Sequence, residues 1–264
     1  MKSNPTTCAI ILAAGQGTRL RPYTDDKPKC LVNLAGHPLL QHQVAALRAA
    51  GIETIGVVTG YYSQKIESLG HRTFYNGDYA NTNMVASAMC AEAWLRGDDD
   101  VLLCYGDIVY EPHIIRKLMN CDAQLSTTVD QSWESLWRLR QEDPLNDAET
   151  MKVDEQGRIL EIGKKPGSLA DIDAQYMGLI RIRADFAQRF FTIYDSLERH
   201  TSYDGKDWAN MYMTTYLQLL IQHTPLTAVS VEGGWLEVDT VEDIELFNRM
   251  HLTGELAPFW KSTL

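Results

Sequence analysis

The chain has 264 residues, of which 45% are hydrophobic and 22% are charged, and this balance excludes disordered and fibrous proteins. Its formal net charge of -11 argues against a non-specific nucleic-acid-binding protein, because such a protein carries a basic face. No apolar stretch reaches the ~18 residues of a membrane-spanning helix, and the N-terminus lacks the apolar core of a signal peptide, so we expect a cytoplasmic protein without membrane contact.

Short apolar runs alternate with helix-like stretches in the first half of the chain. The run Cys8–Ala13 is continuously apolar, which is typical of a strand buried on both faces. Residues Pro38–Ala50 repeat apolar side chains at helical spacing and end before Gly51. We expect strands at 8–13, 54–58, 72–75 and 101–104, separated by helices at 38–50, 64–69 and 83–95. This alternation predicts βαβ units with right-handed crossovers and a parallel sheet.

The pattern changes after residue 120, where strand-like segments become more frequent. We expect, in chain order, a strand at 124–129, a hairpin of 151–153 and 158–162, a strand at 176–182, helices at 184–197 and 208–222, a strand at 227–231, a short strand at 235–238 and a closing helix at 240–252. Thr240 is the expected N-cap of the closing helix. The sequence therefore favours one domain with an inserted or trailing β-rich lobe over two independent domains.

The cysteines are odd in number, and no two of them have C-x-x-C spacing. This pattern argues against a disulfide framework and against a zinc site. Because several lie within apolar runs, we expect reduced and mostly buried thiols at Cys8, Cys30, Cys90, Cys104 and Cys121.

A glycine-rich segment, Leu12–Pro22, directly follows the first strand. Gly15 and Gly17 allow the backbone to approach a ligand and to offer N–H groups to phosphate oxygens, and Arg19 adds a cationic fork. The segment is not a Walker A loop, because it lacks G-K-[ST], and it is not the dinucleotide fingerprint, because residue 20 is leucine. Two glycines alone are equally compatible with a plain strand-to-helix turn.

The whole segment resembles the signature of the nucleotidyltransferases that join an NTP to a sugar phosphate or another small phosphorylated alcohol. That signature reads L-A-A-G-x-G-[TS]-R-[LM]-x-P-x-T and is followed by P-K, which Thr24 and Pro28-Lys29 match here. Further family motifs follow in the same order, namely Gly106-Asp107, Gly163-Lys164-Lys165-Pro166 and Val238-Asp239-Thr240. The resemblance implies a Rossmann-like three-layer α/β/α domain over 1–264, with a central mixed, mostly parallel sheet. Its nucleotide-binding part would span about 1–122, and a small β-rich lobe in about 123–264 would bind the acceptor.

Four charged residues of these motifs suit phosphate chemistry. Arg19 would clamp the β- and γ-phosphates, and the Lys29 ammonium would neutralise charge that builds up on the α-phosphate. Asp107 follows a buried strand, at the edge where open α/β sheets bind ligands, and together with Asp239 it would hold Mg²⁺. The alternatives are a solvated lysine at 29, a turn-forming aspartate at 107 and a helix-capping aspartate at 239.

Several segments resemble the branch of cytidylyltransferases for phosphocholine and for aminoethylphosphonate-like acceptors. They are Asn76–Tyr79, Thr82–Met84 with Ser87, Val129–Trp133, Gln175–Leu179 and Gly233–Asp239. Asn83 and Ser87 lie one helical turn apart, so an amide and a hydroxyl would meet a pyrimidine base or a ribose, unless they are ordinary polar residues of a helix start. The expected nucleotide-binding residues are Leu12, Ala13, Ala14, Gly15, Gln16, Gly17, Thr18, Arg19, Lys29, Asn83, Ser87 and Gly106.

For the acceptor we expect an aromatic and acidic wall, which would hold a cationic amine through ion pairing and cation–π contact. The candidates are Asp130, Trp133, Trp137, Tyr176, Trp208 and Trp235. Lys164 or Lys165 would bind the acceptor's phosphate or phosphonate, and the resemblance favours Lys164. The alternatives are core packing of the aromatic rings, a turn capped by Asp130 and a solvated lysine pair.

These observations favour a Mg²⁺-dependent cytidylyltransferase that moves CMP from CTP to a small phosphate- or phosphonate-bearing acceptor and releases pyrophosphate. A sugar-1-phosphate nucleotidylyltransferase that uses UTP, dTTP or GTP shares the phosphate loop and is the second candidate. A non-catalytic nucleotide sensor is the third, although such a protein would be expected to lose an acid or Lys29. The resemblance also allows a homodimer.

Overall fold

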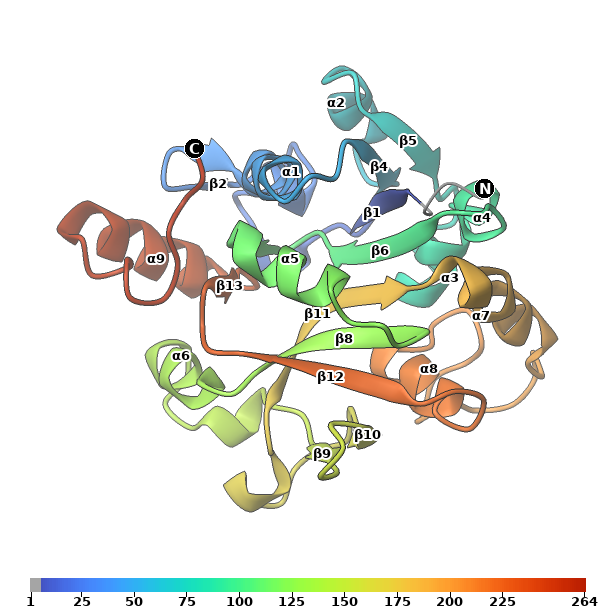
Figure 1. Ribbon diagram of the computed structural model, residues 1–264. Helices are drawn as coiled ribbons and strands as arrows, with labels where there is room; N and C mark the ends of the chain where they lie inside the picture. Colours follow the sequence, from blue (N-terminus) through green and yellow to red (C-terminus); the bar gives the residue numbers. More distant parts are fainter. Residues whose placement is uncertain (1–5) are drawn as a thin grey trace.

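The computed structural model describes residues 6–264, and a seven-stranded sheet runs through its centre (Figure 1). The strand order is β12-β8-β11-β6-β1-β4-β5, and every neighbouring pair is parallel except the two pairs that include β11. These strands are β1 (Thr7–Ala13), β4 (Thr54–Thr59), β5 (Arg72–Tyr75), β6 (Asp100–Tyr105), β8 (Leu125–Asp130), β11 (Gln175–Ile182) and β12 (Leu226–Val231). The predicted mixed, mostly parallel sheet is confirmed. The first five residues, which belong to the N-terminal stretch where no signal peptide is expected, lie outside the described residues.

Strand β1 explains why its sequence is apolar without interruption. Successive side chains of a strand point to opposite faces, and here both faces are covered. Ala9 and Ile11 belong to one buried cluster, whereas Cys8 and Ile10 belong to the other, and each of the four is at most 2% exposed. A strand between two cores needs apolar residues at every position, which is the pattern that Cys8–Ala13 shows.

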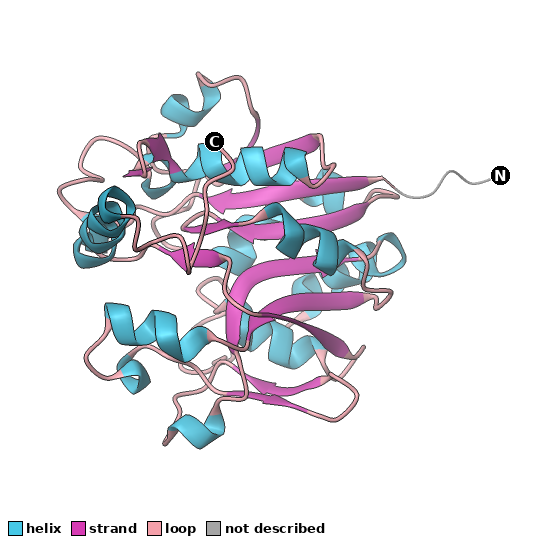
Figure 2. Cartoon of the chain, turned by 60° about the vertical axis from the view of Figure 1, so that its left-hand side comes forward, coloured by secondary structure: helices cyan, strands magenta, loops and turns pink. Residues whose placement is uncertain are grey.

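Helices lie on both faces of the sheet and give the three layers (Figure 2). The cluster on one face includes residues of α1 (Leu39–Ala49), α5 (Pro112–Met119) and α9 (Val241–Thr253). The other face packs against α3 (Met84–Met89), α4 (Glu92–Leu95), α7 (Ala184–Ser196) and α8 (Met213–Leu220). The two remaining α-helices are α2 (Ser63–Glu67) and α6 (Trp133–Arg140).

Three short strand pairs complete the elements and bring distant segments together. The predicted hairpin forms from β9 (Met151–Val153) and β10 (Ile159–Ile162), which lie below β12 in Figure 1. Strand β13 (Trp235–Glu237) pairs antiparallel with β7 (Ile108–Tyr110), and β2 (Asn33–Leu34) pairs with β3 (His37–Pro38). The β7–β13 pair positions the segments that contain Asp107 and Asp239.

Two predicted helices differ from the observed ones. The helix expected at 83–95 is divided into α3 and α4, because Ala91 leaves helical geometry at φ -89° and ψ 28°. The helix expected at 208–222 begins only at Met213. The Asp207 carboxylate accepts the backbone N–H of Asn210 at 2.9 Å, and such a local side-chain contact competes with a helix start.

The expectations about thiols and helix capping are confirmed. All five cysteines are unpaired, and Cys8, Cys30 and Cys104 are buried. The Thr240 hydroxyl accepts the N–H of Asp243 at the start of α9, and the Asp243 carboxylate returns a contact to the backbone of Thr240, which completes a capping box. Between residues 6 and 264 there is no helix with the length and apolar character needed to cross a bilayer.

Candidate active site

The glycine-rich loop after β1 has a backbone that only glycine adopts easily. Gly17 is left-handed, with φ 62° and ψ 44°, and a Cβ atom there would lie 2.8 Å from Cβ of Lys29. The Thr24 hydroxyl donates a 2.8 Å hydrogen bond to the Gly17 carbonyl oxygen and fixes the loop from the other side. Gly17 therefore allows Lys29 to pass directly behind the loop.

A cavity of about 270 Å³ opens between this loop and the ends of β1 and β6. It is called the phosphate-loop cavity below, and it is lined by Leu12, Ala13, Gly15, Gly17, Thr18, Arg19, Lys29, Cys30, Met84, Gly106, Asp107 and Asp239. A Cβ atom on Gly106 would lie 2.5 Å from the Leu12 carbonyl oxygen, so the two strand ends approach closely. The cavity lies at the strand-end edge that was predicted for ligands.

Two carboxylates and two cations form one cluster on the wall of this cavity. The Lys29 ammonium donates to Asp107 Oδ2 and to Asp239 Oδ1, both at 2.8 Å, and the Arg19 guanidinium contacts Asp239 Oδ2 at 2.5 Å. Burial alone would lower the pKa of Lys29, but the two carboxylates outweigh it and raise that pKa. The ammonium is therefore held in its charged form on the wall of the phosphate-loop cavity.

Asp107 has a further feature that suits a cation. Its Oδ1 atom is buried and has no hydrogen-bond partner within residues 6–264. Hard carboxylate oxygens are the ligands that Mg²⁺ prefers, so Asp107 and Asp239 fit such an ion. In the described part of the chain, no cluster of three or more His, Cys, Asp or Glu side chains is arranged as a metal site.

A smaller cavity of about 70 Å³ adjoins the phosphate-loop cavity, with which it shares Leu12, Gly15 and Met84. Asn83 and Ser87 both line it, as do Ala14, Tyr79 and Thr82. Asn83 is the N-cap of α3, since its Oδ1 accepts the Met84 N–H at 2.8 Å, so the helix-start alternative holds for that oxygen. Ser87 Oγ accepts from the Asn76 amide at 3.0 Å, which leaves the hydroxyl hydrogen for another partner.

The structure brings nearly all of the expected nucleotide-binding residues together. Leu12, Ala13, Ala14, Gly15, Gly17, Thr18, Arg19, Lys29, Asn83, Ser87 and Gly106 line one of these two cavities or both. Gln16 is the exception, because it lines neither.

A third cavity, of about 190 Å³, continues the groove on the other side and shares Arg19, Met84 and Asp239 with the phosphate-loop cavity. Its walls are acidic and aromatic, so it is called the acidic cavity below. The remaining lining residues are Tyr105, Trp137, Asp147, Glu149, Gln175, Tyr176, Tyr212, Met213, Thr214 and Glu237.

Two glutamates of the acidic cavity have strongly shifted acidities. Burial, reinforced by the charge of Asp147, raises the pKa of Glu149 to about 7. Burial also raises the pKa of Glu237 to about 7, although the Arg140 guanidinium opposes the shift. A cation in this cavity would stabilise the charged form of both carboxylates and so offset the cost of their burial.

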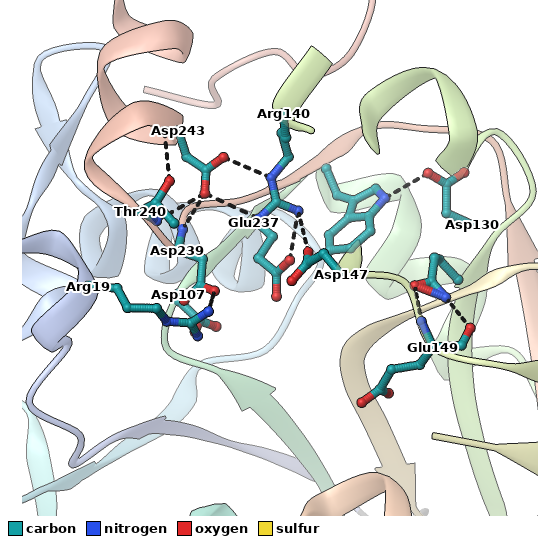
Figure 3. Close-up of polar contacts among 12 residues, drawn as sticks. Arg19, Asp107, Asp130, Arg140, Asp147, Glu149, Glu237, Asp239, Thr240 and Asp243 are labelled. Carbon is teal, nitrogen blue, oxygen red and sulfur yellow. Dashed lines mark hydrogen bonds and ion pairs between the residues drawn. The ribbon is translucent and has the colours of Figure 1, made fainter. Parts of the chain in front are cut away.

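Glu149 is held by its backbone, so that its side chain is available to the cavity. The Gln175 side chain accepts the Glu149 N–H at 3.3 Å and donates to its carbonyl oxygen at 2.8 Å. In Figure 3 the Glu149 carboxylate points away from these two bonds, and no contact to the other drawn residues is marked. Nearby, the Tyr176 hydroxyl is buried and has no hydrogen-bond partner among residues 6–264.

The structure corrects the acceptor role expected for Asp130. This carboxylate is 1% exposed and lies in the protein interior, outside the acidic cavity. Its Oδ1 accepts the N–H groups of Ser132 and Gly233, both at 2.9 Å. Its Oδ2 accepts the indole N–H of Trp235 at 2.9 Å, the bond that Figure 3 draws. The capping alternative therefore describes Asp130, because protein donors already occupy its carboxylate.

Four other expected acceptor residues also lie outside the acidic cavity. Trp133 and Trp235 are 5% and 1% exposed, so they pack in the core. Trp208 stacks on Tyr194 with ring centroids 4.4 Å apart, and Lys164 is an exposed lysine that pairs with Glu161. Of the expected acceptor residues, Tyr176 and Trp137 line the acidic cavity.

Comparison with known proteins agrees with this geometry. The sequence profile of the MobA-like NTP transferase domain matches residues 9–157. The CTP:phosphoglutamine cytidylyltransferase of Campylobacter jejuni is 39% identical over 248 residues, which cover 90% of this chain and 98% of that protein. The 2-aminoethylphosphonate cytidylyltransferase of Lancefieldella rimae is 27% identical over 248 residues, or 92% of each chain.

Among solved structures, the CTP:phosphocholine cytidylyltransferase of Streptococcus pneumoniae (LicC) has the same fold, with a TM-score of 0.67 at 20% identity. The alignment covers 93% of this chain and 99% of that one. The fold agrees over that aligned part of the chain, and the profile match includes the glycine-rich loop, Lys29 and Asp107. The chain therefore belongs to the family of MobA-like NTP transferases, and it is a nucleotidyltransferase.

Proposed function

We propose that this enzyme transfers CMP from CTP to a small acceptor that carries a phosphate or a phosphonate, and that pyrophosphate leaves. One observation carries the proposal: a continuous groove places the cluster of Lys29, Asp107 and Asp239 between the glycine-rich loop and the acidic cavity. The relatives named for phosphoglutamine and for 2-aminoethylphosphonate, both cytidylyltransferases, support CTP and a small phosphorylated or phosphonate acceptor.

The reaction needs positioning and charge neutralisation more than it needs a base. A phosphate or phosphonate oxygen is already ionised at neutral pH, so it attacks the α-phosphorus directly. The new bond joins that oxygen to the α-phosphorus, and the bond from the α-phosphorus to the β-phosphate oxygen breaks, with its electrons leaving on pyrophosphate. Arg19 would hold the β- and γ-phosphates, while Lys29 would neutralise the α-phosphate oxygens during attack.

Asp107 and Asp239 would hold a Mg²⁺ ion, for which the buried and unpartnered Oδ1 of Asp107 is suited. When bound, the ion would supply positive charge to the triphosphate and help to orient it. Lys29 contacts both carboxylates, and it would turn toward the α-phosphate when CTP binds.

The acidic cavity would accept an ammonium group of the acceptor. Asp147, Glu149 and Glu237 give it negative charge, and Tyr176 and Trp137 give it aromatic faces. This arrangement keeps the chemistry that was expected for Asp130 but assigns it to other residues. A cytoplasmic location, where the five unpaired thiols would stay reduced, completes the proposal.

A pyrophosphate-release screen tests the function. CTP, UTP, dTTP, GTP and ATP would each be combined with phosphocholine, 2-aminoethylphosphonate, phosphoglutamine and sugar 1-phosphates, in the presence of Mg²⁺. We expect the fastest turnover with CTP and an acceptor that carries both a phosphate or phosphonate and an ammonium group. Equal or faster turnover with another nucleotide and a sugar 1-phosphate would contradict the proposal and support the second candidate.

A further inference from the structure

Arg140 is a buried cation that the chemistry described above does not use. It is the last residue of α6, and its side chain is 1% exposed. Three carboxylates surround the guanidinium, those of Asp243, Glu237 and Asp147, as Figure 3 shows. A buried charge needs opposite charges and hydrogen bonds from its neighbours, and here those neighbours adjoin the active site.

The contact with Asp243 reaches the backbone of Asp239. Arg140 Nε donates to Asp243 Oδ1 at 2.9 Å, and Nη2 donates to Oδ2 at 3.2 Å, which makes a two-pronged pair. The same Oδ2 accepts the backbone N–H of Asp239 at 2.9 Å and that of Thr240 at 3.0 Å. The Asp243 carboxylate, which pairs with Arg140, therefore also fixes the main chain at Asp239.

The remaining guanidinium nitrogen, Nη1, contacts carboxylates that precede Asp239 in the chain. Arg140 Nη1 donates to Glu237 Oε2 at 2.9 Å and lies 3.8 Å from Asp147 Oδ2. Glu237 is the last residue of β13, two positions before Asp239. The Arg140 guanidinium thus holds the side chain of Glu237. Through Asp243 it also holds the backbone of Asp239 and Thr240.

We propose that Arg140 is a positioning residue, which keeps the Asp239 carboxylate directed at Asp107 and Lys29 without touching either substrate. The proposal rests on the proposed metal-binding role of Asp239. Only a planar fork with several donors reaches Asp243 and Glu237 together, whereas a lysine at this place keeps the charge but offers a single point of contact. Arg140→Lys therefore keeps the positive charge but removes the simultaneous contacts with Asp243 and Glu237.

The test compares Arg140→Lys with Arg181→Lys. Arg181 is a matched control, because it is also a buried arginine that pairs with a carboxylate, Asp100, at 2.5 Å, but it lines none of the three cavities. Mn²⁺ affinity in the presence of CTP would be measured by electron paramagnetic resonance, together with Tm, kcat and the CTP KM. Asp239→Asn serves as the reference for a lost ligand.

We expect Arg140→Lys to weaken Mn²⁺ binding and to lower kcat, each by about tenfold or more, with the CTP KM changed less than about threefold, as for residues that orient metal ligands. Arg181→Lys should lower Tm but leave Mn²⁺ affinity and kcat within about twofold. If Arg140→Lys lowers only Tm while Asp239→Asn weakens Mn²⁺ binding, Arg140 only stabilises the fold. The inference is then wrong. If Asp239→Asn itself leaves Mn²⁺ binding unchanged, the metal role fails, and the inference fails with it.

If the Arg140→Lys protein does not fold, Asp243→Asn is tested in its place. This variant keeps the shape of the side chain and removes the charge that pairs with Arg140. The same loss of Mn²⁺ affinity and kcat is expected, and unchanged values would overturn the inference.

Discussion

Asp130 and Glu149, two carboxylates only 19 positions apart in the chain, have opposite surroundings. Asp130 accepts hydrogen bonds from three N–H groups of the protein and is closed to solvent. Glu149 is held only through its backbone, by Gln175, and lines the acidic cavity. The first arrangement stabilises the fold, while the second leaves a charge available to a ligand.

Matched amide substitutions at these two sites should give opposite results. Glu149→Gln should raise the KM of an ammonium-bearing acceptor about tenfold or more and leave the CTP KM nearly unchanged, because it removes one charge from the cavity. Asp130→Asn should leave both KM values unchanged and lower Tm by roughly 5–10 °C, as expected for a loss of about 2–3 kcal/mol in buried hydrogen bonds. Steady-state kinetics and a melting curve on the same preparations check both. A raised acceptor KM in Asp130→Asn would return that residue to the acceptor site.

The raised pKa of Glu149 also predicts how stability depends on pH. Its pKa is about 7 in the folded protein against 4.5 ordinarily, so between these values the folded state binds more protons than the unfolded state. The free energy of unfolding therefore falls as pH rises through this window, and the cost is complete above about pH 7. Glu149→Gln should raise Tm relative to the unsubstituted protein at pH 8 but have little effect at pH 4.5. A difference in Tm that is the same at both pH values would show that the carboxyl titrates normally.

At the scale of helices and strands, the sequence predicts an element best where its local residue pattern agrees with its burial in the fold. The continuous apolar run of β1 and the glycine-rich turn after it are such cases, and both are found where expected. Helix α5 is absent from the expected elements, although Pro112 at its start is a helix signal that the sequence does contain. The break between α3 and α4 depends on packing, which periodicity does not reveal.

The acceptor residues were harder to predict, for a physical reason. The three donors to Asp130 lie 2, 103 and 105 positions away along the chain, so nothing in the local sequence distinguishes a satisfied carboxylate from a free one. Glu149 lies in a segment without periodicity, and Gln175, which holds it, is 26 positions away. The segments Gln175–Leu179 and Gly233–Asp239 are sequence signals near this cavity, but neither includes Glu149.

The turn after β1 offers a prediction of its own. Gly17→Ala would place a Cβ 2.8 Å from Lys29 Cβ and would strain a left-handed residue, so we expect Lys29 to be displaced and kcat to fall about tenfold or more. Gly70→Ala is the control, because Gly70 is also left-handed, at φ 78°, but a Cβ atom there would meet no other atom within 4 Å. It should lower Tm slightly and leave kcat unchanged. Equal kcat values for the two variants would show that contact with Lys29 is unimportant.

At the scale of the whole molecule, one sheet unites the two halves of the chain. Strands β8, β11 and β12, which follow residue 122, continue the sheet that β1, β4, β5 and β6 begin. The groove likewise draws on both halves, since the glycine-rich loop and Asp107 come from the first and Asp239 and Glu237 from the second. A nucleotide bound in this groove would contact both halves at once.

Binding should therefore stabilise the molecule as a unit. CTP with Mg²⁺ at about 100 times the Kd should add about 2.7 kcal/mol and raise Tm by roughly 5–10 °C. In Asp239→Ala, CTP should give the same smaller shift with and without Mg²⁺, because a ligand of the ion is missing. A Mg²⁺-dependent shift that persists fully in Asp239→Ala would place the ion elsewhere.

The bond between Lys29 and Asp239 joins residues 210 positions apart, and this distance has a consequence for biosynthesis. A ribosome adds Lys29 and Asp107 well before it adds the second carboxylate, Asp239. Until then a nascent chain has the glycine-rich loop and can form early βαβ units, but it lacks the partner that completes the cluster. Nascent chains that end before residue 239 are therefore expected to lack nucleotidyl transfer.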